Sequence, residues 1–477
     1  MHSLSSIRQP LLVLIGLGTF LCAESVAAAQ TKPNVVFIFI DDMGYGDIGP
    51  FGSTVNQTPS LDRMAAEGLK LTQFYVSNTA CTPSRSALLT GTYARRIGMD
   101  GRVLFPGEKR GLNPNEVTIA DMLQAQGYAT GCFGKWHLGD QPEFLPLAQG
   151  FDEYFGIPYS NDMWPGNKRG NPLTNRGPYT PLPVVRQNKA VAYVSDGADQ
   201  SLLCEVMTDE AIKFITGHKD EPFFLYLPHA YIHGPRYARP EIFEKAERNV
   251  LRANVQEVDT SVGRVLGTLR ELKLDKNTLV IFTSDNGGAG GSMGPLRGRK
   301  GGPKYEGHMR EPTIVWWPGT IPAGIASAEI VASVDILPSL ARLTGAEVPR
   351  DRRIDGQDAL DVLLGKPQAR SPHEVLFYET DAVRRGKWKL LRKQVKGKRV
   401  TELYDLEADI GEKTNRLKTH PELAKQLGAL LDAHARDLAQ DTRPAGFVET
   451  AQPIISRSGE LPRLRELLKM PGVKAAR

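Results

Sequence analysis

The chain has 477 residues, a length that excludes a single simple core and predicts one large and one small domain. Its hydrophobic content of 41% and charged content of 24% are ordinary for a soluble globular protein. The net charge of +5 is a mild excess, which suits anionic substrates and gives no reason to expect nucleic acid as a partner.

Residues 1–29 have the pattern of a secretory signal peptide. Arg8 supplies the positive charge, residues 11–23 form the apolar core, and residues 27–29 offer an A-x-A cleavage site. The alternative is a membrane anchor, but the apolar run is shorter than the about 20 residues that span a bilayer. We therefore expect an exported protein, periplasmic or secreted, with no membrane span after signal cleavage.

Strand and helix patterns alternate between residues 34 and 345. The run 35–40 is β-branched or aromatic throughout, which indicates a strand buried on both faces of a parallel sheet. The alternation predicts an α/β fold, doubly wound, with a mostly parallel sheet flanked by helices. The expected strands are 35–40, 69–75, 128–133, 222–227 and 278–283, and the expected helices are 58–68, 117–126, 205–216 and 251–272.

The stretch 156–189 is expected to be a long irregular region, because Pro, Gly and Asn are frequent in it. It is either a functional rim or a surface insertion with solvated charge. No acidic residue lies between Met163 and Ala190, and the basic residues in that interval are Lys168, Arg169, Arg176, Arg186 and Lys189.

Beyond about residue 366 the pattern changes to short strands separated by turns. A small antiparallel sheet with one packed helix is expected, with strands at 375–378, 387–391 and 402–404 and a helix at 420–438. The predicted organisation is a catalytic domain at 30–365, a small C-terminal α+β domain at 366–450 and a tail at 451–477.

The stretch C-T-P-S-R-S-A-L-L-T-G, residues 81–91, predicts a loop that turns into a short helix. Pro83 suits the first helical position, and Gly91 is a plausible stop. Cys81 then lies at the helix mouth, where free N–H groups favour an anion. Arg85 follows one turn later and can lean back toward Cys81.

Pairs of carboxylate or amide side chains follow two of the expected strands. Asp41 and Asp42 come after the first strand, and Asp285 and Asn286 come after the strand 278–283. Oxygen ligands at the carboxyl edge of a parallel sheet suit a hard divalent cation such as Ca²⁺ or Mg²⁺. The alternative for each pair is a helix cap on a solvated loop.

Lys135 and His137 follow the strand 128–133. Because they alternate, they share one side of the chain if that segment is extended. The remaining cysteines outside the signal peptide, Cys132 and Cys204, are either paired in an oxidising compartment or two buried thiols.

The motif C-T-P-S-R followed by L-L-T-G resembles the signature of the type I sulfatases, arylsulfatase A-like enzymes of the alkaline phosphatase superfamily. The resemblance implies an alkaline phosphatase-like fold and hydrolysis of aryl sulfates or sulfated carbohydrates. It also implies a maturing enzyme that oxidises Cys81 to Cα-formylglycine, and one bound calcium ion, with magnesium as the alternative. The implied metal ligands are Asp41, Asp42, Cys81, Asp285 and Asn286.

The hexapeptide G-K-W-H-L-G also resembles the family. It implies that Lys135 contacts the formylglycine and the sulfate, and that His137 is a base near a formylglycine hydroxyl. His233 matches the family histidine that precedes a small residue and Pro, with His229 as the competing assignment. Ser160 resembles a serine that lines the sulfate pocket.

A lysine of the family lies in the pattern L-R-G-x-K-G, which Lys300 fits. The spacing to the following Tyr-Glu-Gly departs by one residue, so Lys304 remains a rival. The implied catalytic residues are Cys81, Arg85, Lys135, His137, His233 and Lys300, and the implied substrate-binding residues are Ser160, Lys135, His233 and Lys300.

Two other functions compete with a sulfatase. A phosphohydrolase or phosphotransferase of the same superfamily would normally use a Ser or Thr nucleophile and zinc-type ions with His ligands. An inactive glycan-binding protein on a sulfatase scaffold would have lost some of the residues above, and Cys81, Arg85, His137 and Asp285 are all present.

Overall fold

The computed structural model describes residues 32–455 and 461–469. The signal peptide predicted at 1–29 lies outside the described residues. Within the described part of the chain, no helix combines the length and the apolar character that crossing a membrane requires. The domain boundaries at 365 and 450 stay predictions.

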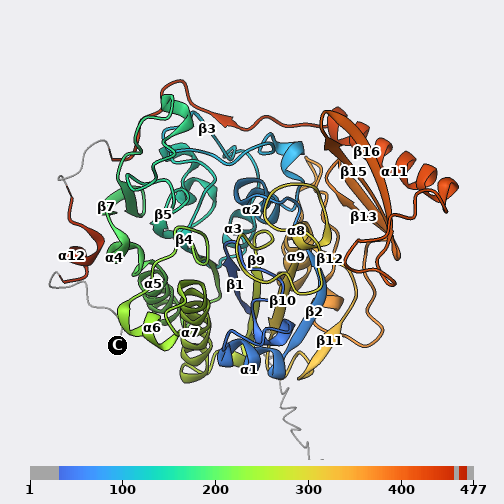
Figure 1. Cartoon of the computed structure of the whole chain (residues 1–477). Helices are drawn as coiled ribbons and strands as arrows, with labels where there is room; N and C mark the ends of the chain where they lie inside the picture. The colour runs from blue at the N-terminus through green and yellow to red at the C-terminus, as the bar shows by residue number, and fades with distance from the viewer. Residues whose placement is uncertain (1–31, 456–460, 470–477) are drawn as a thin grey trace, which may run out of the picture. The chain divides into compact units, whose positions relative to one another are not determined.

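A sheet of 11 strands carries the functional site (Figure 1). In sheet order its strands are β11 (Ile325–Ser327), β2 (Leu69–Tyr75), β10 (Arg310–Trp316), β9 (Thr278–Ser284), β1 (Asn34–Ile40), β8 (Phe223–Pro228), β4 (Ala129–Lys135), β5 (Glu153–Ile157), β6 (Leu182–Arg186) and β7 (Lys189–Val194), and β12 (Val331–Ala332) also pairs with β2. The neighbours from β9 to β5 are parallel, whereas β10, β6 and β7 pair in antiparallel fashion. The predicted mostly parallel α/β sheet is confirmed.

Two groups of helices cover the two faces of this sheet. The α-helices of this part of the chain, not all of which lie on the sheet, are α1 (Pro59–Glu67), α2 (Cys81–Thr90), α3 (Ile119–Gln124), α4 (Gly197–Gln200), α5 (Leu203–Gly217), α6 (Pro240–Lys245), α7 (Val250–Glu271), α8 (Glu306–Met309), α9 (Ile336–Thr344) and α10 (Leu360–Leu363). Val35, Phe37 and Phe39 of β1 pack in one core with α2, α3, α9 and α10. The β1 residues between them pack in a second core with α1, α5 and α7. This double burial is the reason that β1 is apolar throughout.

The C-terminal part contains the small antiparallel sheet that the sequence predicts. Its strands are β13 (Val375–Tyr378), β14 (Ala382–Arg385), β15 (Trp388–Val395) and β16 (Lys398–Asp405), with α11 (Pro421–Gln440) as the packed helix. Leu390 and Leu403 of the sheet pack against Leu427 and Leu431 of α11. Strand β14 was not predicted from the sequence.

The prediction of an irregular region up to residue 189 is wrong for its last part, residues 182–189. Strand β6 and the start of β7 lie there and form an antiparallel hairpin. Its tight turn places Gln187 at a φ of 56°, a position where Gly is more usual. Because no Gly marks this turn, little in the amino-acid sequence indicates a hairpin.

Two short elements connect the end of the chain to earlier segments, one to a short strand in a separate two-stranded sheet and the other to the large sheet. Strand β17 (Gly446–Phe447) pairs with β3 (Arg110–Gly111). Helix α12 (Leu464–Leu467) buries Leu464 completely in the second core. The described part of the predicted tail is therefore packed against the large sheet.

Candidate active site

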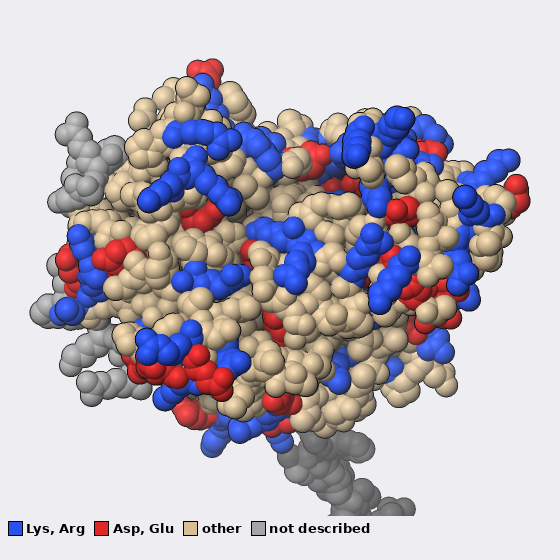
Figure 2. Space-filling view, in the orientation of Figure 1, with Lys and Arg blue, Asp and Glu red and all other residues tan. Residues whose placement is uncertain are grey.

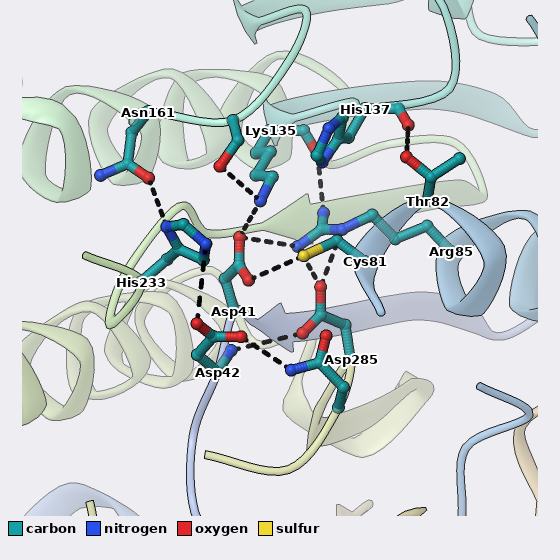
Figure 3. A network of polar contacts seen from close by, with 12 residues as sticks. Asp41, Asp42, Cys81, Thr82, Arg85, Lys135, His137, Asn161, His233 and Asp285 are labelled. Atoms are coloured by element: carbon teal, nitrogen blue, oxygen red, sulfur yellow. Dashed lines mark hydrogen bonds and ion pairs between the residues drawn. The ribbon is translucent and has the colours of Figure 1, made fainter. Parts of the chain in front are cut away.

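Strand ends bring the predicted polar residues together. Asp41 and Asp42 follow β1, Asp285 follows the last residue of the neighbouring strand β9, and Lys135 is the last residue of β4. Figure 3 shows their side chains converging on Cys81. The carboxyl edge of the parallel strands therefore builds the site, as it does in open α/β sheets generally.

Cys81 is the first residue of α2, and it is 1% exposed. The helix begins two residues before Pro83, so the predicted start at Pro83 is wrong, whereas the stop at Gly91 is confirmed by its left-handed φ of 62°. The Cys81 Sγ lies 3.5 Å from Asp41 Oδ1 and 3.3 Å from Lys300 Nζ. Burial and then Asp41 raise the pKa of the Cys81 thiol to about 12, so the thiol is neutral near pH 7.

Arg85 holds the carboxylates on the far side of Cys81. Its Nε and Nη2 lie 3.0 and 2.8 Å from Asp285 Oδ2, and its Nη1 donates to the Lys135 carbonyl at 2.8 Å. Nη2 also lies 3.5 Å from Asp41 Oδ2. The guanidinium is fully buried, and although burial opposes its charge, Asp285 and Asp41 raise its pKa above the usual value. Arg85 thus holds Asp41 and Asp285 in place, instead of only leaning back toward Cys81 as the sequence predicts.

The acidic groups fit a divalent cation. One ligand atom from each of Asp41, Asp42, Cys81 and His233 lies within 4.8 Å of the others. Two further buried oxygens, Asp42 Oδ2 and Asn286 Oδ1, have no hydrogen-bond partner. Unpaired buried oxygens are costly unless a cation balances them, and an oxygen-rich set suits Ca²⁺ or Mg²⁺.

Asp285 and Asn286, which the sequence also predicts as ligands, lie at the same cluster. The Asn286 Nδ2 donates to Asp42 Oδ1 at 2.7 Å, and the Asn286 Oδ1 has no hydrogen-bond partner in the protein. Asp285 Oδ1 accepts the Asp42 N–H at 3.3 Å, while Oδ2 is taken by Arg85. Their role as metal ligands stays a prediction.

Two lysines balance the acidic cluster. Lys135 Nζ pairs with Asp41 and lies 3.1 Å from Ser160 Oγ, and Lys300 Nζ lies 2.7 Å from Asp42 Oδ1. Burial alone would raise the pKa of Asp41, but Lys135, His233 and Arg85 together hold it well below its usual range. The carboxylate is therefore ionised at any pH at which the enzyme would work.

The structure separates the two rival lysines. Lys300 contacts both Cys81 and Asp42, whereas Lys304 Nζ lies 3.6 Å from Glu379 and does not line the cavities at Cys81. The register L-R-G-x-K therefore places Lys300 at the cluster.

The rival histidines are separated in the same way. His233 Nε2 lies 3.6 Å from Asp42 Oδ2, and its Nδ1 lies 3.1 Å from Asn161 Oδ1. His229 is fully buried and contacts Ser261 Oγ at 2.9 Å, away from the cluster. Burial, and then Lys300, lower the pKa of His233 from its usual value.

His137 faces the cavity at Cys81, but not from the extended segment that the sequence predicts. Its φ of 62° is left-handed, so the strand ends at Lys135. The Nε2 lies 3.0 Å from the Leu104 carbonyl oxygen, and the buried Nδ1 has no partner. Burial, Lys135 and Arg85 hold its pKa well below the usual value, so His137 is neutral with one ring nitrogen free.

Two residues of the site are not predicted by the sequence analysis. Asn161 orients His233, and Thr82 Oγ1 donates to the His137 carbonyl oxygen at 2.8 Å. Each lies next to a predicted site residue, Ser160 or Cys81, which was the only signal for it in the chain. The two other cysteines, Cys132 and Cys204, are free and buried.

Comparison with known proteins agrees with this geometry. The family model described as Sulfatase matches residues 33–346, and the one described as N-sulphoglucosamine sulphohydrolase, C-terminal, matches residues 303–437. The chain belongs to the type I sulfatase family. It is a sulfuric ester hydrolase.

Individual relatives of this sulfatase cover most of its length. Human arylsulfatase A is 39% identical over 406 residues, which are 77% of this chain and 76% of the relative. The N-acetylgalactosamine-6-sulfatase of Sus scrofa is 40% identical over 376 residues, which are 74% and 69% of the two chains. A structure from Bacteroides thetaiotaomicron, described for the metabolism of multiple glycosaminoglycans, is 30% identical with a TM-score of 0.73 and covers 85% of this sulfatase and 100% of its own chain.

Proposed function

We propose that the protein is an exported sulfatase that releases inorganic sulfate from sulfated carbohydrates, with Cα-formylglycine at position 81 and a bound calcium ion. The observation that carries the proposal is the contact of Cys81 with Lys300 and Asp41 at the mouth of α2. Similarity to N-acetylgalactosamine-6-sulfatase supports a sulfated sugar as the substrate.

The unmodified cysteine is poorly suited to this chemistry. Its neutral thiol is a weak nucleophile. A simple thiol or hydroxyl that accepted the sulfuryl group would also remain sulfated. The hydrate of an aldehyde at this position supplies two hydroxyl groups, one to accept the sulfuryl group and one to expel it. An oxidising maturing enzyme is therefore the partner that the proposal requires.

Positively charged groups bind the sulfate and stabilise the negative charge that develops on it. Lys300, which contacts Cys81, and Lys135, which pairs with Asp41, hold the sulfate oxygens. A calcium ion held by Asp41, Asp42, Asp285, Asn286 and residue 81 would neutralise further charge and lower the pKa of the attacking hydroxyl. Arg85 keeps Asp285 and Asp41 in place for this task.

Two proton transfers take place at residue 81. His233 and Lys300 face the larger cavity and protonate the departing alcohol. His137, which is neutral and has a free Nδ1, accepts the proton of the second hydroxyl. Loss of that proton re-forms the aldehyde and releases sulfate, so no water molecule attacks sulfur.

The experiment is a sulfate-release assay on purified protein that was co-expressed with a maturing enzyme. The panel contains sulfated monosaccharides and disaccharides, an aryl sulfate and the matching phosphate esters. We expect release of sulfate from at least one sugar, with faster turnover than for the phosphate analogue. Preferential hydrolysis of phosphate esters would overturn the proposal in favour of the phosphohydrolase alternative.

A further inference from the structure

The cavity on the leaving-group side is much larger than a sulfate group requires. A cavity of about 310 Å³ contains Cys81, His137 and Ser160, and an adjoining one has a volume of about 850 Å³. His233 and Lys300 line both. Because these two residues protonate the alcohol in the proposed reaction, the larger cavity is the place for the rest of the substrate.

Arg236 lines the larger cavity with an incompletely bonded guanidinium. Its Nε donates to the Ile232 carbonyl at 2.8 Å, and its buried Nη2 has no hydrogen-bond partner. Among the described residues, no carboxylate lies within ion-pair distance of it. Asp47 is near enough to feel its charge, but accepts the N–H groups of Gly44 and Ser292. The guanidinium of this cavity-lining residue therefore keeps hydrogen-bonding capacity that no protein group uses.

The opposite rim adds more positive charge. Lys168 and Arg169 line the larger cavity, and Arg169 and Arg176 line the smaller one. All three are exposed, and within the described part of the chain none forms an ion pair with a carboxylate. Arg186, from the same basic run, is instead paired with Glu210 at 2.8 Å. Three unpaired cations of this run thus reach the cavities, whereas Lys189, which is also exposed and without an ion pair among the described residues, lines neither of them. Lys and Arg side chains gather in several places on the face of the molecule shown in Figure 2.

The other walls suit a sugar. Trp164 is 6% exposed, packs edge-on against Tyr237 with ring centroids 6.0 Å apart, and both line the cavity. Asp162 also lines the cavity, and its Oδ1 has no hydrogen-bond partner. Its carboxylate can accept a hydrogen bond from a sugar hydroxyl. Apolar walls with a few placed polar groups are the usual composition of a small-molecule site.

We propose that Arg236, assisted by Arg169 and Lys168, binds a second anionic group of the substrate. The substrate is then a saccharide that carries, besides the scissile sulfate ester, another sulfate or a carboxylate. Arginine suits this task because its fork matches either group with two parallel hydrogen bonds. The inference rests on the proposed function and specifies its substrate class.

The test compares saccharides that share one scissile sulfate ester. The first has no other charge, the second carries another sulfate and the third carries a carboxylate. For Arg236→Gln we expect kcat/KM to fall roughly ten- to hundredfold on the charged members, since a charge-assisted hydrogen bond is lost. The member with a single charge should change by less than about threefold. Arg236→Lys, which keeps the charge without the fork, should be intermediate. The charged saccharide with the larger fall in kcat/KM identifies the second anion as a sulfate or a carboxylate.

Arg299→Gln is the matched control, because Arg299 also acts on Asp47 but does not line the cavity. It should leave the preference unchanged. Equal losses on all three saccharides, or an equal effect of Arg299→Gln, would overturn the inference and leave the sulfatase proposal intact. If no saccharide releases sulfate, the proposed function fails, and calorimetric binding to Cys81→Ala protein decides the inference separately. Tighter binding of the charged saccharides that is lost on adding Arg236→Gln supports it, and equal binding contradicts it.

Discussion

Lys300 and Cys81 meet at 3.3 Å although 219 positions separate them in the chain. The lysine also lies 2.7 Å from Asp42, so one ammonium group bridges the nucleophile position and the acidic cluster. Burial opposes the charge of Lys300, but the carboxylates of Asp42 and Asp41 hold its pKa well above the usual value. A positively charged donor thus lies where the sulfate and the departing oxygen would be in the proposed reaction.

Replacing Lys300 should affect turnover much more than replacing Lys304. We expect Lys300→Ala to lower kcat by roughly a hundredfold or more, because a donor to the developing charge is lost. Steady-state kinetics on the best sugar of the panel provide the measurement.

Lys304→Met is the matched control for Lys300. The lysine is 6% exposed and paired with Glu379, so its loss should lower thermal stability while kcat stays within a few-fold. A large loss of kcat for Lys304→Met, with Lys300→Ala nearly unaffected, would move the sulfate lysine to position 304.

Removing an oxygen ligand should remove metal and activity together. We expect Asp42→Ala and Asn286→Ala to lose stoichiometric calcium, because each takes an unpaired buried oxygen from the cluster. Elemental analysis of purified protein, paired with the sulfate-release assay, measures both effects.

Asp140→Asn serves as the control for the metal variants. Asp140 is buried close to His137 in the chain but outside the cluster, and its Oδ2 accepts the Gly107 N–H at 2.7 Å. This variant should keep its calcium. Stoichiometric zinc in active protein, together with indifference to added calcium, would refute the oxygen-ligand assignment.

A buried ion pair beneath the small sheet predicts a specific response to acid. Lys389 Nζ lies 2.9 Å from Glu306 Oε1, and both side chains are fully buried. Burial alone would raise the pKa of Glu306, but Lys389, Arg384 and Arg310 lower it far below the usual value. Because the pKa of Glu306 is lower in the folded than in the unfolded protein, its ionised carboxylate stabilises the fold above about pH 4.5, the unfolded pKa. This contribution is lost as the pH falls from there through the folded pKa.

Glu306→Gln should therefore lower the free energy of unfolding at pH 7 by about 3 kcal/mol, since Lys389 loses one of its two buried carboxylate partners and keeps only Glu412, at 3.0 Å. Its stability should also decline less steeply than that of the wild type below about pH 4.5. Urea unfolding at several pH values measures both. Glu374→Gln, which removes an exposed partner of Arg385, should have little effect. Parallel pH curves for Glu306→Gln and wild type would contradict this account.

The elements at the site could be predicted because their signals are local. The continuous apolar run of β1 and the carboxylates directly after it identify both a buried strand and its functional end. Asn161 could not be predicted, because its partner His233 lies 72 positions away and only the fold brings them together. The left-handed φ of His137 likewise depends on the packing around it, including the contact with Leu104.

The most direct test of the central claim measures the state of residue 81 and the activity in the same samples. Protein is produced with increasing amounts of a maturing enzyme, and peptide mass spectrometry gives the fraction of Cys81 that has become the aldehyde. We predict that the rate of sulfate release is proportional to this fraction and that Cys81→Ala protein, although folded, is inactive. Full activity in protein whose Cys81 is wholly unmodified would contradict the account.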